Sequence, residues 1–61
     1  MAINHAHYWV YKDRANQWRW TYYAANGRKI ADSAEGYNNE ADCLHGIALM
    51  KGSANSPVYK G

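Results

Sequence analysis

The 61-residue sequence lacks several features on which small proteins usually depend for stability or targeting. It has one cysteine, Cys43, which excludes an intramolecular disulfide and is typical of a reducing compartment. No apolar run approaches the ~20 residues of a membrane-spanning helix. The N-terminus, MAINHAHYW, has no basic region followed by a long apolar stretch. We therefore expect a cytoplasmic protein without a secretion signal.

Charge of one sign is also scarce. Seven Lys and Arg residues against five Asp and Glu residues give a formal net charge of +2, and no block of Lys or Arg appears. A balance this mild permits a nucleic-acid partner but does not argue for one. Aromatic residues are abundant by contrast, with three Trp, six Tyr and no Phe. Trp and Tyr combine apolar area with a polar group, which suits interfaces and half-exposed sheet faces.

The chain length limits the core that one copy can build. We interpret residues 1–61 as a single domain with its core at about 5–60. A chain this short buries only ~60% of the surface that its unfolded form exposes. Ordering costs ~1.5 kcal/mol per residue, so a small core leaves little surplus. Disulfides, a metal or a partner chain are the usual remedies, and the lone cysteine excludes the first.

Alternating patterns predict three strands in the first half of the chain, at residues 5–12, 18–25 and 28–33. The polar segment 13–17 predicts the first turn. Asn26-Gly27 is a strong hairpin signal, because a tight two-residue turn needs positive φ at both central positions. The simplest arrangement is an antiparallel meander.

A helix is predicted next, from about Glu40 to Lys51. Asn39 precedes it as a candidate cap, with Asp42 three residues later in a weak form of the capping box. Acidic residues in the first turn suit the helix dipole, and Gly52 suits the end. The connector 52–56 leads to a last short strand, Pro57–Lys60, since proline is tolerated at a strand's first position.

The helix and strand periods divide the side chains into two faces. A mid-helix glycine such as Gly46 costs ~1 kcal/mol relative to alanine, and close approach of the helix to bulky aromatic rings would explain it. The residues expected to pack between sheet and helix are Tyr8, Val10, Trp18, Trp20, Tyr22, Ile30, Cys43, Ile47 and Met50. The residues expected on the opposite sheet face are His5, His7, Trp9, Tyr11, Arg19, Thr21 and Tyr23.

Two interpretations of that opposite face stay open. Aromatic rings interleaved with an arginine are the ingredients of a platform for single-stranded nucleic acid or a small ligand, where each stacked base is worth ~1–3 kcal/mol. The binding residues would be Trp9, Tyr11, Arg19, Thr21 and Tyr23. The structural interpretation is cross-strand packing, with Arg19 over a ring for ~0.5–1 kcal/mol. We favour the second, because the net charge is weak.

Six short motifs together resemble the YegP-like family of small bacterial proteins of unknown function. They are Tyr11-Lys12-Asp13, Trp18-Arg19-Trp20, Ala24-Ala25-Asn26-Gly27, Ile30-Ala31, Glu35-Gly36-Tyr37 and Gly46-Ile47, preceded by an aromatic strand. The resemblance covers roughly residues 8–58. The sequence departs from the family at His45, where the family often has Asn, so a role of that Asn is not carried over. Leu44 is more apolar than the family's usual residue.

The resemblance implies an α+β fold, a β-β-β-α-β unit whose antiparallel sheet carries one helix on one face. It also implies that two units join with their C-terminal strands exchanged. The sequence holds one copy and no internal repeat, so we expect a homodimer in which Pro57, Val58 and Tyr59 carry the exchange. The thin core of a single copy leads to the same expectation, because exchanging an identical element is a low-cost route to a dimer.

Catalytic and metal-binding patterns are weak. His5 and His7 share a strand face, but zinc needs three or four ligands and nothing pairs His45 with them. Cys43 and His45 stand at i and i+2, which point to different sides of a helix. We interpret Cys43 as a small buried hydrophobic residue. Gly36 is expected to serve backbone conformation, and Tyr37 to anchor its loop on the helix.

The sequence has no Ser/His/Asp set, paired carboxylates or glycine-rich phosphate loop. We therefore expect no enzyme, no catalytic residue, no cofactor and no metal. The prediction is a non-catalytic structural or interaction module that acts as a homodimer. The alternative is binding of single-stranded nucleic acid or a small ligand on the aromatic sheet face.

Overall fold

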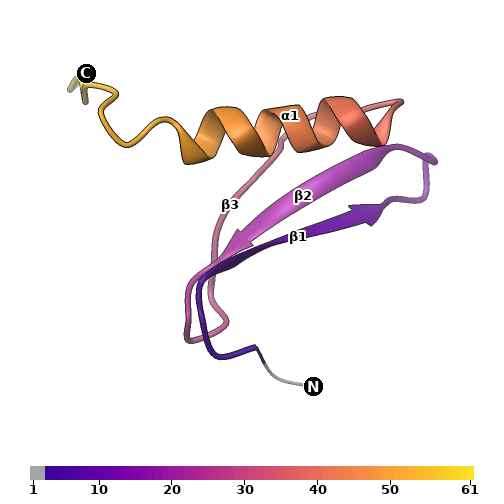
Figure 1. The fold of residues 1–61 in the computed structure, drawn as a ribbon, viewed down its shortest axis with the longest axis horizontal. Helices are drawn as coiled ribbons and strands as arrows, with labels where there is room; N and C mark the ends of the chain where they lie inside the picture. Colours follow the sequence, from indigo (N-terminus) through magenta and orange to yellow (C-terminus); the bar gives the residue numbers. More distant parts are fainter. Residues whose placement is uncertain (1–2) are drawn as a thin grey trace.

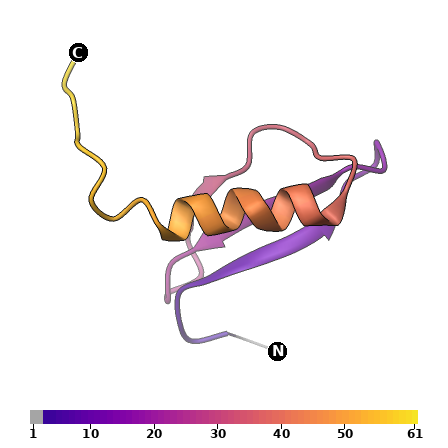
Figure 2. The ribbon, with the colours of Figure 1, turned by 45° about the horizontal axis from the view of Figure 1, so that its top comes forward.

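The computed structural model describes residues 3–61. Three strands, β1 (His7–Lys12), β2 (Trp18–Tyr23) and β3 (Lys29–Asp32), precede one helix, α1 (Glu40–Lys51). The strands form one antiparallel sheet in the order β1-β2-β3. The helix lies across one face of this sheet, as Figures 1 and 2 show. The predicted elements are therefore confirmed up to the helix, with strands shorter at their ends than expected.

Both hairpin loops contain three residues. Asp13 N donates to Gln17 O (2.9 Å) in the first loop, and Ala24 N donates to Arg28 O (2.8 Å) in the second. Each loop has a left-handed residue at its third position, Asn16 with φ 63° and Gly27 with φ 87°. The predicted two-residue turn is wrong, because Gly27 has a positive φ and Asn26 does not. A type I turn followed by a left-handed residue is the usual three-residue solution.

The best-buried side chains lie where the helix meets the central strand. Trp20 is 5% exposed and Cys43 is fully buried. Tyr8 packs edge-on against Trp20, with ring centroids 5.5 Å apart, and lies 4.7 Å from the ring of Tyr22. A β-carbon at Gly46 would lie 3.4 Å from the indole nitrogen of Trp20. Close approach of the helix to aromatic rings therefore explains the mid-helix glycine, as predicted.

Two residues assigned to the core are more exposed than predicted. Ile30 is 61% exposed. The β2–β3 register shifts between Tyr22, which pairs with Ala31, and Tyr23, which pairs with Lys29. This shift places Ala31 rather than Ile30 opposite the helix-facing ring of Tyr22. Met50 lines an opening between the helix and the sheet and is 42% exposed.

The helix ends differ in detail from the predicted caps. Asn39 is the N-cap residue, with extended backbone and no side-chain hydrogen bond to the helix backbone. The side-chain nitrogen Nδ2 of Asn39 instead lies 3.5 Å from Oδ2 of Asp42, so the weak capping box does not form. Gly52 ends the helix with φ −84°, a conformation open to any residue.

The C-terminal segment does not form a strand within this chain. Residues 57–61 extend away from the end of the helix, as the yellow segment in Figures 1 and 2 shows. Val58 is 95% exposed and Tyr59 is 88% exposed. The last strand of the expected β-β-β-α-β unit is therefore not completed inside one polypeptide, and its pairing with a second copy stays a prediction.

Candidate interaction surfaces

The sheet face turned away from the helix, here called the outer face, carries the predicted binding residues. The β1–β2 register pairs His7 with Tyr23, Trp9 with Thr21, and Tyr11 with Arg19. The predicted set Trp9, Tyr11, Arg19, Thr21 and Tyr23 therefore lies on one surface. Trp9 is 52% exposed and Tyr11 is 36% exposed, whereas Thr21 is buried between its neighbours. The outer face thus offers two accessible rings on the edge strand β1.

The cations of the outer face are held by carboxylates. Arg19 Nε donates to Asp13 Oδ2 at 2.5 Å, and Arg19 Nη1 donates to the carbonyl of Ala34 at 3.3 Å. The hydrogen bond from Arg19 lowers the pKa of Asp13 and raises the pKa of Arg19. Lys29 pairs in the same way with Asp32, at 2.6 Å. These ion pairs leave little uncompensated positive charge for a phosphate.

The Asp13–Arg19 pair was not found by sequence reasoning, although both residues lie in quoted motifs. Arg19 was expected to stack on a ring, but it bonds to Asp13 and to Ala34 instead. Asp13 also accepts backbone hydrogen bonds from Ala15 (2.9 Å) and Gln17 (3.0 Å), so it organises the first hairpin loop. The cation over an aromatic ring is Lys12, 5.3 Å from the ring centroid of Trp18.

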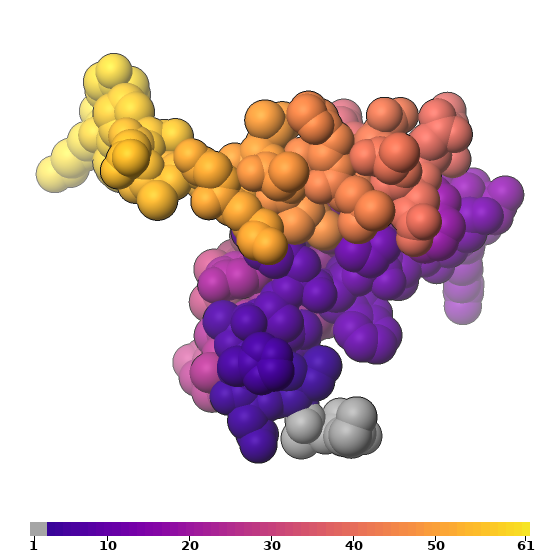
Figure 3. Space-filling model, in the orientation of Figure 1, coloured from indigo at the N-terminus to yellow at the C-terminus, as the bar shows by residue number. Residues whose placement is uncertain are grey.

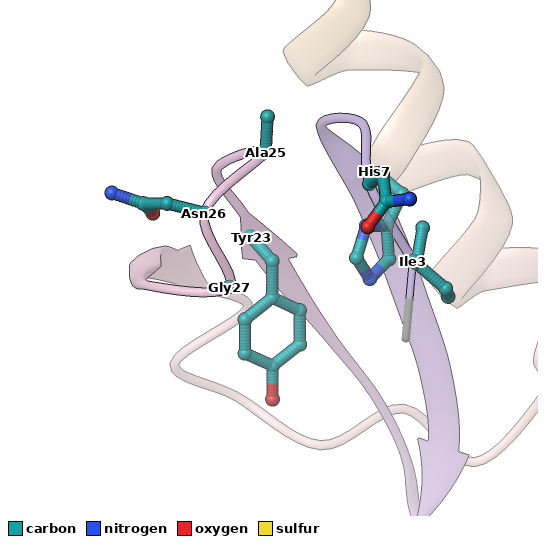
Figure 4. A pocket seen from close by; sticks show the side chains of 7 residues that line it. Ile3, His7, Tyr23, Ala25, Asn26 and Gly27 are labelled. Carbon is teal, nitrogen blue, oxygen red and sulfur yellow. The ribbon is translucent and has the colours of Figure 1, made fainter. Parts of the chain in front are cut away.

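A shallow pocket of about 480 Å³ lies at the end of the outer face, and Figure 4 shows its side chains. The rings of His7 and Tyr23 stack at 5.3 Å on one side, and Asn26 and Gly27 of the second hairpin loop line another. His7 Nδ1 lies 2.9 Å from the carbonyl of His5. Within residues 3–61, no three His, Cys, Asp or Glu side chains stand close enough to hold a metal ion.

A larger opening of about 760 Å³, here called the α1/β1 groove, runs between the helix and the first strand. Tyr8, Val10 and Tyr22 line its floor, and Ile47, Met50 and Lys51 line its helix side. These residues were predicted as closed core, apart from Lys51, and the structure leaves the space between them open. The groove was missed because sequence periodicity identifies the faces that meet, not how completely they cover each other.

The helix is also apolar on sides that no other element covers. Leu44 is 48% exposed and Leu49 is 64% exposed. Helices that are apolar all round are usually buried in a larger assembly. In the sequence, Leu44 and Leu49 gave this signal, because both lie outside the helix residues expected to face the sheet.

The remaining candidates are Cys43 and Tyr37, which both lie against the helix or within it. Cys43 is fully buried, and this burial raises the pKa of its thiol, whereas His45 is exposed on a different side of the helix. Tyr37 pairs through its backbone with Trp18: Trp18 N donates to Tyr37 O (2.7 Å), and Tyr37 N donates to Trp18 O (2.9 Å). The Tyr37 hydroxyl lies beside Gly46 of the helix, so the loop is anchored as predicted. Burial raises the pKa of Tyr37.

Gly36 serves close approach rather than an unusual backbone conformation. Its φ lies outside the left-handed region, in contrast to that of Gly27. A β-carbon at Gly36 would lie 2.8 Å from the β-carbon of Gln17. The expectation that Gly36 supplies backbone conformation is therefore corrected.

Comparison with known proteins assigns the chain to a family. Residues 13–59 match the family described as "Domain of unknown function (DUF1508)". The chain belongs to the DUF1508 family. A UPF0339 protein of Neisseria meningitidis serogroup B is 40% identical over 50 residues, which cover 80% of this chain and 88% of that protein. A UPF0339 protein of Treponema denticola is 40% identical over 45 residues, covering 74% and 76%.

These relatives confirm the resemblance to the YegP-like family of unknown function. The same fold occurs in an experimental structure, since the solution structure of a protein from Haloferax volcanii superimposes with a TM-score of 0.84 at 34% identity. The superposition covers 95% of this chain and 98% of that one. The α+β fold, with a three-stranded antiparallel sheet and one helix, is thus confirmed. Among residues 3–61, no helix is both long and apolar enough to cross a bilayer.

Proposed function

We propose that this DUF1508 protein is a non-catalytic interaction module of the cytoplasm that acts as a homodimer with exchanged C-terminal strands. The observation that carries the proposal is that one chain has both an exposed C-terminal segment with apolar side chains and an open groove lined by aromatic and aliphatic side chains. Val58 and Tyr59 are almost fully exposed, while Val10, Ile47 and Met50 line the α1/β1 groove. Burying each of these surfaces against the other would remove apolar area from water at about 25 cal/mol per Å².

The exposed helix supports the same proposal. Leu44, Leu49 and Met50 are each more than two-fifths exposed, which is costly in a domain with so small a buried core. A small domain without disulfides has little surplus stability, and oligomerisation is one of the usual ways to add to it. A second copy supplies the missing cover without any new sequence.

Sedimentation equilibrium at micromolar concentration tests the proposal. We expect twice the 6.9 kDa chain mass. Deletion of residues 56–61 should shift the mass to one chain and lower the midpoint of thermal unfolding, because each subunit loses a bordering strand. A chain shortened by Gly61 alone is the matched control and should behave as the full chain does. A truncated protein that is monomeric and as stable as the full chain would contradict the exchange.

A second candidate rests on Trp9 and Tyr11, whose rings are accessible on the outer face beside Arg19. Single-stranded nucleic acid stacks on such rings. The ion pairs of Arg19 and Lys29 argue against it, because phosphate contacts need free cations.

Titration with a short single-stranded oligonucleotide separates the two candidates. The main proposal expects no change in Trp fluorescence at low salt. Salt-sensitive quenching that disappears in Trp9→Ala or Arg19→Ala variants would instead establish the nucleic-acid candidate.

A further inference from the structure

We infer that the outer face binds an extended, uncharged oligosaccharide, whose sugar rings lie along β1 and whose end enters the pocket at His7 and Tyr23. This function goes beyond the proposed homodimer and does not depend on it. The helix packs on the opposite face of the sheet, and Figure 3 shows the C-terminal tail projecting beyond the helix. A chain-like ligand therefore reaches the outer face without displacing either segment.

Three rings follow one another along the outer face of β1 and are here called the ring stripe. His7, Trp9 and Tyr11 are each two residues apart, which is about 6.8 Å in an antiparallel strand. Trp9 is 52% exposed, and its cross-strand partner is the small, buried Thr21. The face of an aromatic ring is the negative part of its quadrupole, so it attracts the weakly positive C–H groups on the flat faces of a pyranose. The ring stripe therefore offers successive stacking positions to the sugars of an extended chain.

Hydrogen-bonding groups flank the ring stripe on the neighbouring strands. Arg19 of β2 lies opposite Tyr11. On β3, Lys29 and Asp32 share this face, because they pair with outer-face residues of β2. Toward residues 3–61, Arg19 donates through Nε and Nη1, so its Nη2 group can donate to a ligand hydroxyl. Lys29 has further N–H groups besides the one directed at Asp32. The hydroxyl groups of a sugar stacked on β1 therefore lie toward donors and acceptors of β2 and β3.

The charges of the outer face favour an uncharged ligand. Arg19 is paired with Asp13, and Lys29 is paired with Asp32, so each of these cations has an adjacent carboxylate. A phosphate chain would meet a carboxylate beside each of them, and an apolar ligand would desolvate both ion pairs without replacing their contacts with water. A sugar hydroxyl both donates and accepts, so it matches groups of either sign. The ion pairs that argue against nucleic acid therefore favour a neutral sugar chain.

The pocket at the end of the ring stripe also carries uncharged polar groups. Its volume of about 480 Å³ falls within the roughly 300–1,000 Å³ of small-molecule sites. Because a carbonyl only accepts, the 2.9 Å contact with the carbonyl of His5 places the proton of the neutral His7 ring on Nδ1 and leaves Nε2 as an acceptor. Asn26 Oδ1 accepts from Arg28 N at 3.0 Å, which leaves Asn26 Nδ2 to donate. Figure 4 shows the rings of His7 and Tyr23 side by side at this opening, so a terminal sugar finds an aromatic surface, an acceptor and a donor.

An NMR titration of isotope-labelled, full-length protein with cellotetraose, an uncharged and extended β-linked oligosaccharide, tests the inference. We expect the largest chemical-shift changes at the Trp9 indole N–H and at the amides of His7 and Tyr11, with a dissociation constant of about 1 mM or below. This constant should change less than about twofold between low salt and about 0.5 M salt, because a neutral ligand releases no counterions.

Three results would overturn the inference. They are the absence of shifts at about 10 mM cellotetraose, shifts confined to the helix, and salt-sensitive binding of an oligonucleotide to the ring stripe in place of the sugar. Each of them leaves the proposed homodimer standing, because the sedimentation mass of the unliganded protein tests that proposal separately.

Two pairs of variants locate the site. Trp9→Ala should raise the dissociation constant for cellotetraose at least about tenfold, whereas Leu49→Ala, which truncates an exposed side chain of the helix, should leave it unchanged. His7→Ala should raise it several-fold, whereas His45→Ala, at an exposed histidine of the helix, should not. Circular dichroism checks that each variant is folded. Equal effects within both pairs would contradict the assignment of the ligand to the outer face.

Discussion

Replacement of Gly36 by alanine tests whether the loop after β3 is fixed by close contact. The new β-carbon would lie 2.8 Å from the β-carbon of Gln17, where ordinary contact begins at 3.4 Å. The backbone must therefore move by about 0.6 Å, the difference between these two distances. The same loop holds the two Trp18–Tyr37 backbone hydrogen bonds, at 2.7 and 2.9 Å, and this movement strains them.

Overpacking of this kind costs about 1–3 kcal/mol. We expect Gly36→Ala to lower the free energy of unfolding by about 2 kcal/mol, a large part of the roughly 3–9 kcal/mol typical of a domain this size. Urea unfolding followed by Trp fluorescence measures the change. All variants are compared at one protein concentration, because oligomerisation makes stability concentration-dependent.

Two further variants make the test specific. Gly52→Ala is the control, because its β-carbon meets the nearest atoms at 3.5 and 3.7 Å and its φ is ordinary. It should change stability by less than about 0.5 kcal/mol. Gln17→Gly removes the clashing β-carbon, so Gly36→Ala should cost little in that background. A Gly36→Ala protein as stable as Gly52→Ala, or the absence of rescue by Gln17→Gly, would refute the reasoning.

Three other residues give simpler predictions. Ala34 has φ 63°, so Ala34→Gly should stabilise the protein by about 0.5–1 kcal/mol in the same urea assay; destabilisation would contradict it. The bond from Arg19 lowers the pKa of Asp13 below 3.8, so its contribution is complete above pH 3.8 and is lost as pH falls through the folded value. Asp13→Asn should therefore lower stability at neutral pH and reduce the further loss seen in acid titrations by circular dichroism. Cys43 is fully buried with a raised thiol pKa, so its alkylation should proceed only through unfolding and accelerate in urea; rapid native labelling would refute this.

Local patterns were sufficient to predict the elements of this fold. The alternation in HYWVYK and WRWTYY predicted the first two strands, and their pairing places the indole of Trp20 under the helix as expected. Gly46 was correctly interpreted as a site of close approach between helix and sheet. These features depend on side-chain periodicity along one element, which the sequence states directly.

The errors arose where one element meets another. Ile30 was assigned to the core because a regular strand would point it there, but the register shift at Tyr22 and Tyr23 exposes it. The second hairpin loop has three residues rather than two, with a left-handed residue at Gly27 but not at Asn26. Strand register and loop length are set by pairing between segments, and a single segment does not contain that information.

The candidate surfaces divide in the same way. The shared sheet face of Trp9, Tyr11 and Arg19 follows from the sequence, because residues two apart on a strand point the same way and the hairpin aligns the two strands. The ion pair between Asp13 and Arg19 and the open space between β1 and α1 became visible in the three-dimensional structure alone. Ion pairing and packing gaps depend on three-dimensional distances between elements, and the periodicity of a sequence contains no information about those distances.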